Sequence, residues 1–154
     1  MQILALDTGL KTGFATLING QIETGVQDFS KRRGESNGLM FMRFNAWLEE
    51  IHQLSMIKID LIVFERAHHR GGYATEIGVG LTSRVQEFAV RIGAEYMAVH
   101  ANTLKKFITG NGKAGKEAMM AWFEMKTGRK PESDDEADAL ALLYFALHET
   151  MTTI

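Results

Sequence analysis

The alternation of apolar and polar positions divides the chain into short strands followed mainly by helices. Residues 2–7 form a short apolar run and residues 14–18 a β-rich run, and after the turn dipeptide Asn19-Gly20 residues 21–29 can supply a third strand. A two-residue turn of this kind joins antiparallel strands. The first thirty residues are therefore predicted to form an antiparallel meander.

Helical spacing replaces this alternation from about Ser36 to Leu54, and Ser36 is a suitable N-cap. Residues 59–65 are an almost continuous apolar run, which is typical of a strand buried on both faces. The remaining patterns predict a helix, a strand and three more helices, over residues 74–92, 94–100, 103–108, 116–125 and 134–148. Gly78 and Gly80 weaken the prediction in the first half of the helix over 74–92.

This order of elements predicts one α/β domain spanning residues 1–154. Three antiparallel strands plus two parallel strands would form a five-stranded mixed sheet with helices on both faces. The first and fourth strands can lie side by side and parallel, because the helix between them can form a right-handed crossover. No internal repeat, low-complexity tract or linker interrupts the pattern.

Acidic residues end the two strands that are predicted to be parallel neighbours. Asp7 closes the first strand and Glu65 closes the fourth, so their side chains are expected about 5 Å apart at one edge of the sheet. Asp135 and Asp138 share one face in the first turn of the last helix and supply two more carboxylates. Like charges this close repel each other unless one is protonated or a cation lies between them.

Four such carboxylates favour hard divalent cations, Mg²⁺ or Mn²⁺, and the absence of cysteine excludes a thiolate site. Two ions roughly 3.5 to 4 Å apart can activate a water on one side of a phosphate and stabilise the leaving oxygen on the other. The acids therefore predict a two-metal nuclease site. Each acid also has a structural explanation: Asp7 could cap a turn, and Asp134, Asp135 and Glu136 suit a helix N-terminus.

Composition is that of a globular domain, with 45% hydrophobic and 23% charged residues. No apolar run approaches the roughly 18 to 20 residues of a membrane span, and the amino terminus lacks the features of a signal peptide. We therefore expect a cytoplasmic protein without a membrane partner. A formal net charge of -2 argues against nucleic-acid binding, but the basic residues are clustered. One cluster is Lys31, Arg32 and Arg33, for which a solvated surface is the alternative, and the other is Lys105, Lys106, Lys113 and Lys116.

Four motifs, taken in this order, resemble those of RuvC-like Holliday junction resolvases, particularly short phage-type members, within the RNase H-like nuclease superfamily. They are ALDTGLKTGFA around Asp7, LIVFER at Glu65, NTLKKFITGNGKAGKEAM, and DEADALALLYFALHE, the most specific of the four. The resemblance covers nearly the whole chain. It implies an RNase H-like fold, a symmetric homodimer, and Mg²⁺-dependent paired nicking of opposed strands at a four-way DNA junction.

Carried over by position, the resemblance implies the same metal ligands, Asp7, Glu65, Asp135 and Asp138. It also implies phosphate-contacting lysines at Lys105, Lys106, Lys113 and Lys116. Of these, Lys116 opens a helix beside the site and could neutralise the scissile phosphate. Ordinary exposed lysines are the alternative for the other three.

The chain departs from the family pattern just after Glu65. Many members carry a Phe three residues beyond this acid, which stacks on bases at the crossover, and here the position is His68. Rings can stack on bases and Arg can reach phosphate, so the segment is either a substitute junction-reading loop or a surface loop without a role. Its candidate DNA-binding residues are His68, His69, Arg70 and Tyr73.

A four-way junction presents two equivalent strands, and an isologous dimer offers two equivalent sites to cut them. The resemblance therefore implies a symmetric dimer. The helix over 74–92 is the candidate interface, where Gly78 and Gly80 would permit close approach or would mark an irregular helix start.

Three other functions remain open at this point. The segment DTGLKTGFA is also similar to the first phosphate-binding hairpin of actin-like and sugar-kinase-type ATP-binding proteins, although one domain has no room for their second lobe. The chain could be another RNase H-like nuclease that acts on RNA or other branched DNA. It could also be a non-catalytic DNA-binding module.

Overall fold

The computed structural model describes residues 1–69 and 71–152. Strands and helices follow each other in the predicted order. They are β1 (Ile3–Asp7), β2 (Lys11–Ile18), β3 (Gln21–Asp28), α1 (Asn37–Ser55), β4 (Leu61–Glu65), α2 (Gly72–Ile92), β5 (Glu95–Val99), α3 (Ala101–Thr109), α4 (Lys116–Thr127) and α5 (Asp134–Thr152).

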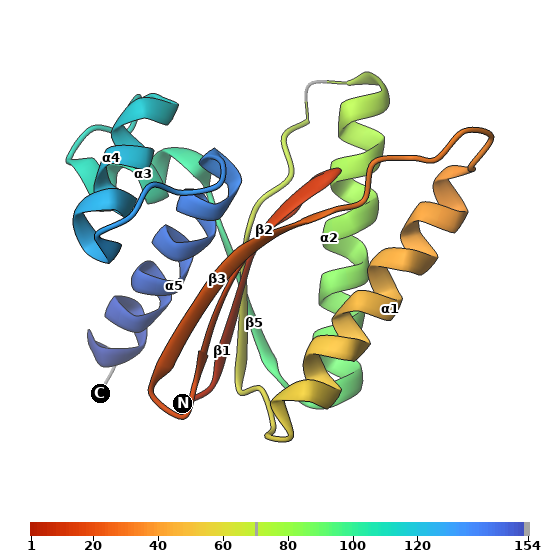
Figure 1. Ribbon diagram of the computed structural model, residues 1–154, viewed down its shortest axis with the longest axis horizontal. Coiled ribbons are helices and arrows are strands. Elements are labelled where there is room, and N and C mark those ends of the chain that lie inside the picture. The colour runs from red at the N-terminus through yellow and green to blue at the C-terminus, as the bar shows by residue number, and fades with distance from the viewer. Residues whose placement is uncertain (70, 153–154) are drawn as a thin grey trace.

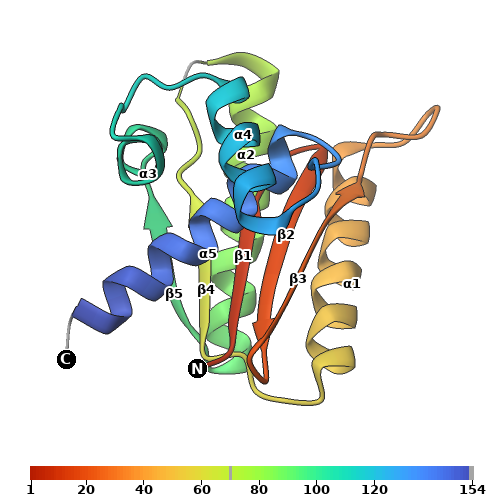
Figure 2. The ribbon, with the colours of Figure 1, turned by 60° about the vertical axis from the view of Figure 1, so that its left-hand side comes forward.

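The five strands form one mixed sheet in the order β3-β2-β1-β4-β5. Strands β1, β2 and β3 are antiparallel neighbours, whereas β4 is parallel to both β1 and β5. Helices α1 and α2 cover one face, and α5 covers the other with α3 and α4 beside it (Figures 1 and 2). The predicted fold class, a five-stranded mixed sheet with helices on both faces, is confirmed.

Each face of the sheet has its own hydrophobic core, because successive side chains of a strand point to opposite faces. In β1, Leu4 and Leu6 pack towards α1 and α2, while Ile3 and Ala5 pack towards α5. The α5 side is rich in small residues, which let this helix lie close to the sheet. Buried alanines on that side are Ala5, Ala15, Ala137, Ala139, Ala141 and Ala146.

Several boundaries differ from the predictions. Strand β2 begins at Lys11, earlier than the predicted run, because it pairs with β3 as far as Asp28. Helix α2 begins at Gly72 and continues without a break through Gly78 and Gly80. A Cβ at Gly80 would lie 2.3 Å from the ring of Phe41, so this glycine serves packing of α2 on α1 within the chain. The expectation that it lets a partner subunit approach, or marks an irregular helix start, is therefore wrong.

Across the described ranges, no helix is both long enough and apolar enough to cross a membrane.

Candidate metal centre

Three carboxylates from three different elements meet at one edge of the sheet. Asp7 is the last residue of β1 and Glu65 the last of β4, and these strands are parallel neighbours. Asp138 joins them from α5, which packs across β1 and β2. One oxygen from each of the three side chains lies within 4.8 Å of the others.

Asp135, the fourth predicted ligand, lies beside this group. Its carboxylate accepts a hydrogen bond from Asp7, which raises the pKa of Asp7. The Ser133 hydroxyl also donates to Asp135 Oδ2 at 3.3 Å. Asp135 is thus linked to the three-oxygen group through Asp7.

Gly13 allows α5 to approach this edge. It lies opposite Asp7 in the β1–β2 ladder. A Cβ at Gly13 would lie 1.9 Å from the carbonyl oxygen of Asp135, so any side chain there would displace the start of α5. Sequence reasoning missed this role, although a glycine inside a strand is a known sign of close backbone approach.

Glu136 fixes the first turn of α5 in place. Its carboxylate is buried and pairs with Arg129, with Nη2 and Oε2 2.7 Å apart. It also accepts hydrogen bonds from the Thr24 hydroxyl and the Glu132 N–H, each at 2.7 Å. Burial raises the pKa of Glu136, but these bonds outweigh it, and the pKa lies below its ordinary value. Sequence analysis assigned Glu136 only to the helix N-terminus and missed this contact with β3.

Burial and mutual repulsion raise the pKa values of the clustered acids. Burial is the larger cause for Asp7, whose pKa is well above its ordinary value, followed by the charges of Asp138, Glu65 and Asp135. The same causes raise the pKa of Asp138 to about 7. Burial also raises the pKa of Glu65, against the opposing effect of His68 and Lys105. The protein's own charges therefore do not neutralise the cluster.

A hard divalent cation fits this arrangement. Three carboxylate oxygens converge from different elements, and hard cations take oxygen ligands of this kind. Asp7, Glu65 and Asp138 are the residues that can hold such an ion, and the raised pKa values show that positive charge between them would relieve repulsion.

The predicted lysines divide into two groups. Lys105 of α3 is close enough to lower the pKa values of Glu65 and Asp138. Lys116, the first residue of α4, has its Nζ 3.6 Å from Asp134 Oδ2 and lowers the pKa of Asp135. Lys106 and Lys113 are exposed, and within the described ranges neither forms an ion pair with the acids.

The segment after β4 forms one wall of a hollow beside the acids. His68 Nε2 lies 3.3 Å from Glu65 Oε1, while His69 is exposed and Arg70 falls outside the described residues. Tyr73 lies in the first turn of α2. The hollow has a volume of about 570 Å³, and Asp7, Glu65, His68, Tyr73 and Ile77 are among the residues that line it.

Comparison with known proteins gives one local sequence match. No profile of a known protein family matches the chain. A segment of 54 residues is 41% identical to the crossover junction endodeoxyribonuclease RuvC of Anaeromyxobacter sp. (strain K). The match covers 35% of this chain and 29% of that relative, so it spans less than a third of the relative's length.

Solved structures match over almost the whole chain. Thermus thermophilus RuvC superimposes with a TM-score of 0.76 at 20% identity, over 99% of this chain and 98% of that one. The same protein in complex with a Holliday junction substrate superimposes with a TM-score of 0.76 at 18% identity, over 98% of this chain and 96% of that one. A yeast mitochondrial Holliday junction resolvase superimposes with a TM-score of 0.56 at 14% identity, over 91% of this chain and 75% of that one. The chain therefore has the RNase H-like fold of RuvC.

Proposed function

We propose that this chain is a divalent-metal-dependent endonuclease that resolves four-way DNA junctions by paired nicking. The observation that carries the proposal is the convergence of Asp7, Glu65 and Asp138 within 4.8 Å, at the edge of the sheet where β1 and β4 end. The shared fold and the local similarity to RuvC support the choice of a branched DNA substrate.

In this proposal, Asp7, Glu65 and Asp138 hold the cations, and Asp135, which lies beside Asp7, supplies a fourth carboxylate. We propose Mg²⁺, with Mn²⁺ as a substitute, and two ions per site. Such ions stabilise developing charge on phosphate oxygens and make water easier to deprotonate. Lys116 lies beside the cluster with an exposed side chain, so it is placed to approach the scissile phosphate and neutralise it.

The surroundings of the acids supply candidate DNA contacts. His68 and Tyr73 line the hollow beside Asp7 and Glu65, where their rings can stack on an unpaired base. His69 and Arg70 belong to the same proposed junction-reading segment. Lys105, Lys106 and Lys113 are proposed phosphate contacts on the α3–α4 side of the cluster.

We propose a homodimer that meets through α2. Val79 and Val90 lie three turns apart on one face of this helix, and they are 38% and 71% exposed. Exposed apolar side chains on a helix face are suited to burial in an isologous contact. Because the proposed substrate is cellular DNA, we also place the protein in the cytoplasm of a bacterial or phage-infected cell.

The decisive experiment incubates the protein with a synthetic four-way junction and Mg²⁺ and maps the cuts on all four strands. We expect symmetric nicks on two opposed strands. Asp7→Asn should abolish cutting but leave junction binding intact or tighter, because it removes a negative charge that faces the phosphate. Failure of the wild type to cut, or persistent cutting by the variant, would contradict the proposal.

Substrate class is tested with the same preparation. Three-way junctions, linear duplex, single-stranded DNA and RNA:DNA hybrid should be cut more slowly than the four-way junction. Equal or faster cutting of the hybrid would instead indicate another RNase H-like nuclease. Sedimentation equilibrium tests the dimer, which Val79→Glu should dissociate without lowering the melting temperature of the monomer.

A further inference from the structure

The loop between β3 and α1 carries three consecutive basic residues that the proposed metal centre does not use. Lys31, Arg32 and Arg33 are all exposed. The loop extends to the upper right in Figure 1, at the same end of the molecule as the first turn of α2. We call these three residues the basic arm.

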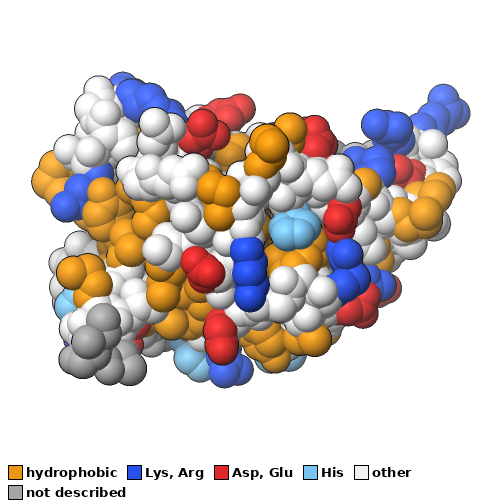
Figure 3. All heavy atoms as spheres, turned by 90° about the horizontal axis from the view of Figure 1, so that it is seen from below, with side chains coloured by type: hydrophobic (Ala, Val, Ile, Leu, Met, Phe, Trp, Pro, Cys, Tyr) orange, Lys and Arg blue, Asp and Glu red, His pale blue; other side chains and the backbone are white. Residues whose placement is uncertain are grey.

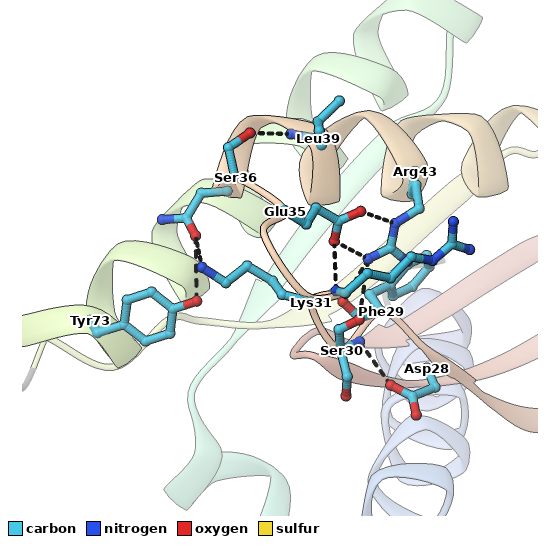
Figure 4. Close-up of polar contacts among 11 residues, drawn as sticks. Asp28, Phe29, Ser30, Lys31, Glu35, Ser36, Leu39, Arg43 and Tyr73 are labelled. Atoms are coloured by element: carbon cyan, nitrogen blue, oxygen red, sulfur yellow. Dashed lines mark hydrogen bonds and ion pairs between the residues drawn. The ribbon is translucent and has the colours of Figure 1, made fainter.

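The base of the basic arm is tied to α1 by one guanidinium group (Figure 4). Arg43 of α1 binds Glu35 through two bonds, Nε to Oε2 at 2.9 Å and Nη2 to Oε1 at 2.6 Å. Arg43 Nη2 also donates to the carbonyl oxygens of Phe29 at 3.2 Å and Ser30 at 3.3 Å. Because Arg43 holds residues on both sides of the basic arm, the position of the arm is fixed before any ligand binds.

The positive charges of the basic arm are available to bind an anionic ligand. Glu35 neutralises Arg43, but in the described part of the chain none of Lys31, Arg32 and Arg33 forms an ion pair. Lys31 instead has neutral partners: its Nζ donates to Asn37 Oδ1 at 3.0 Å and lies 5.2 Å from the centre of the Tyr73 ring. Arg32 is close enough to lower the pKa of Glu35, but that carboxylate already pairs with Arg43, so the exposed tip keeps a net positive charge.

Contacts with Tyr73 place the basic arm next to the hollow beside the metal centre. The Tyr73 hydroxyl donates to Asn37 Oδ1 at 3.4 Å, which is the same oxygen that Lys31 binds. Tyr73 also lines the hollow beside Asp7 and Glu65. Figure 4 shows the Lys31 amino group next to the Tyr73 hydroxyl.

Positive charge therefore flanks the acids on two sides. Lys105 and Lys116 lie on the α5 side, and the basic arm lies beyond Tyr73 on the α2 side. The opposite end of the molecule carries acidic, basic and apolar side chains intermixed, with neither charge dominating (Figure 3). A small anion would need only one of these basic groups, whereas a duplex carries phosphates along its length and can meet both.

We propose that the basic arm is a preorganised phosphate-binding element. It contacts the backbone phosphates of the duplex that extends from the metal centre past the first turn of α2. This inference rests on the proposed function and adds a contact surface to it. Phosphate contacts of this kind set the position of DNA on a protein without reading its sequence. Glu35 and Arg43 are positioning residues, because they hold the basic arm and need not touch DNA.

The test measures binding of a synthetic four-way junction by fluorescence anisotropy in Ca²⁺, over a series of NaCl concentrations. Each lost phosphate contact should reduce the slope of log K against log salt by about 0.9. Arg32→Ala/Arg33→Ala should therefore reduce it by about 2 per protomer and weaken binding roughly tenfold at 0.1 M salt. The control Lys58→Ala/Lys126→Ala removes the same charge elsewhere and should change the slope much less.

A second variant separates positioning from charge. Glu35→Gln removes a negative charge, so electrostatics alone predicts tighter DNA binding. If the basic arm must be held in place, the variant should bind the junction more weakly, by roughly threefold. Glu87→Gln, which removes an exposed negative charge from α2, is the matched control and should bind as tightly as wild type or slightly tighter.

The outcomes distinguish this inference from the proposed function. If the wild type neither binds nor cuts the junction, the proposed function fails. If the wild type binds and cuts, but the arginine variant keeps the wild-type affinity and salt slope, only the basic arm is overturned. Tighter or unchanged binding by Glu35→Gln would overturn the positioning role of Glu35. The Mn²⁺-induced rise in melting temperature shows that each variant is folded with its acids in place.

Discussion

Gly13 lies opposite Asp7 in the β1–β2 ladder, and the carbonyl oxygen of Asp135 occupies the space where a side chain at Gly13 would begin. One missing Cβ thus sets the distance between the acids of the sheet and the acids of α5. The metal centre depends on a residue that contributes no ligand.

Substituting Gly13 by Ala is expected to separate the two halves of the metal centre. The new Cβ would lie 1.9 Å from Asp135 O, so the first turn of α5 must move away from β2. We expect Mn²⁺ affinity, measured by calorimetry, to fall by at least about tenfold and stability to fall by roughly 1–3 kcal/mol. Gly38→Ala, where the nearest atom is 3.7 Å away, is the control and should change neither quantity in this direction.

The free energy of unfolding should depend on pH through Asp138. Its pKa of about 7 in the folded protein lies above the ordinary value of 3.8, so the folded state holds this proton more tightly than the unfolded state. In EDTA, the free energy of unfolding should therefore fall by roughly 2–4 kcal/mol as pH rises from 4 towards 7. It should stay low above pH 7. Melting curves at pH 5 and pH 8 measure the difference.

Asp138→Asn is the companion to this experiment, because it removes the titrating group and keeps its shape. The variant should be more stable than wild type in EDTA at pH 8, and its melting temperature should change less with pH. Added Mg²⁺ should raise the melting temperature of wild type more than that of the variant. The opposite result would be a wild-type protein that becomes more stable than Asp138→Asn as pH rises from 5 to 8 in EDTA. It would contradict the raised pKa of Asp138 in the folded protein.

Glu136 should affect stability and metal binding together. Glu136→Gln leaves Arg129 and Thr24 without their buried carboxylate partner, so we expect a loss of about 1–3 kcal/mol of stability. Because Glu136 fixes the first turn of α5, Mn²⁺ affinity should fall as well. Glu132→Gln changes an exposed acid four residues away and should leave stability and Mn²⁺ affinity close to wild type. Equal effects of the two substitutions would rule out that Glu136 positions the first turn of α5.

Lys105 should tune the pH at which the acids accept a cation. Its charge lowers the pKa values of Glu65 and Asp138, so Lys105→Met should raise both. Lys105 also repels a cation at the same carboxylates, so the variant should bind Mn²⁺ more tightly than wild type at pH 8. Carboxylates must lose their protons to bind metal, so this gain should shrink as pH falls below 7. Lys126→Met, on α4, should show no such pH-dependent difference.

Local pattern was enough to predict the order of strands and helices, because β1 and β4 are apolar runs, the Asn19-Gly20 turn marks the β2–β3 hairpin, and the helices have apolar positions at helical spacing. It was also enough to place Asp7 and Glu65 at neighbouring strand ends, since parallel strands finish at the same edge. Gly13 and Glu136 were missed because their roles depend on contacts with elements distant in the chain. Glu136 in particular looks like a helix-terminal acid until Thr24 and Arg129 are seen around it.

The docking of α5 also decides when the cluster of carboxylates can form during synthesis. Asp7 and Glu65 are made early and can meet as soon as β1 and β4 pair, but Asp138 reaches them only after α5 has been translated and folded onto the sheet. Nascent chains that stop short of this helix carry two of the three carboxylates. Until then, the edge of the sheet lacks one of the three carboxylate oxygens that can hold a divalent cation.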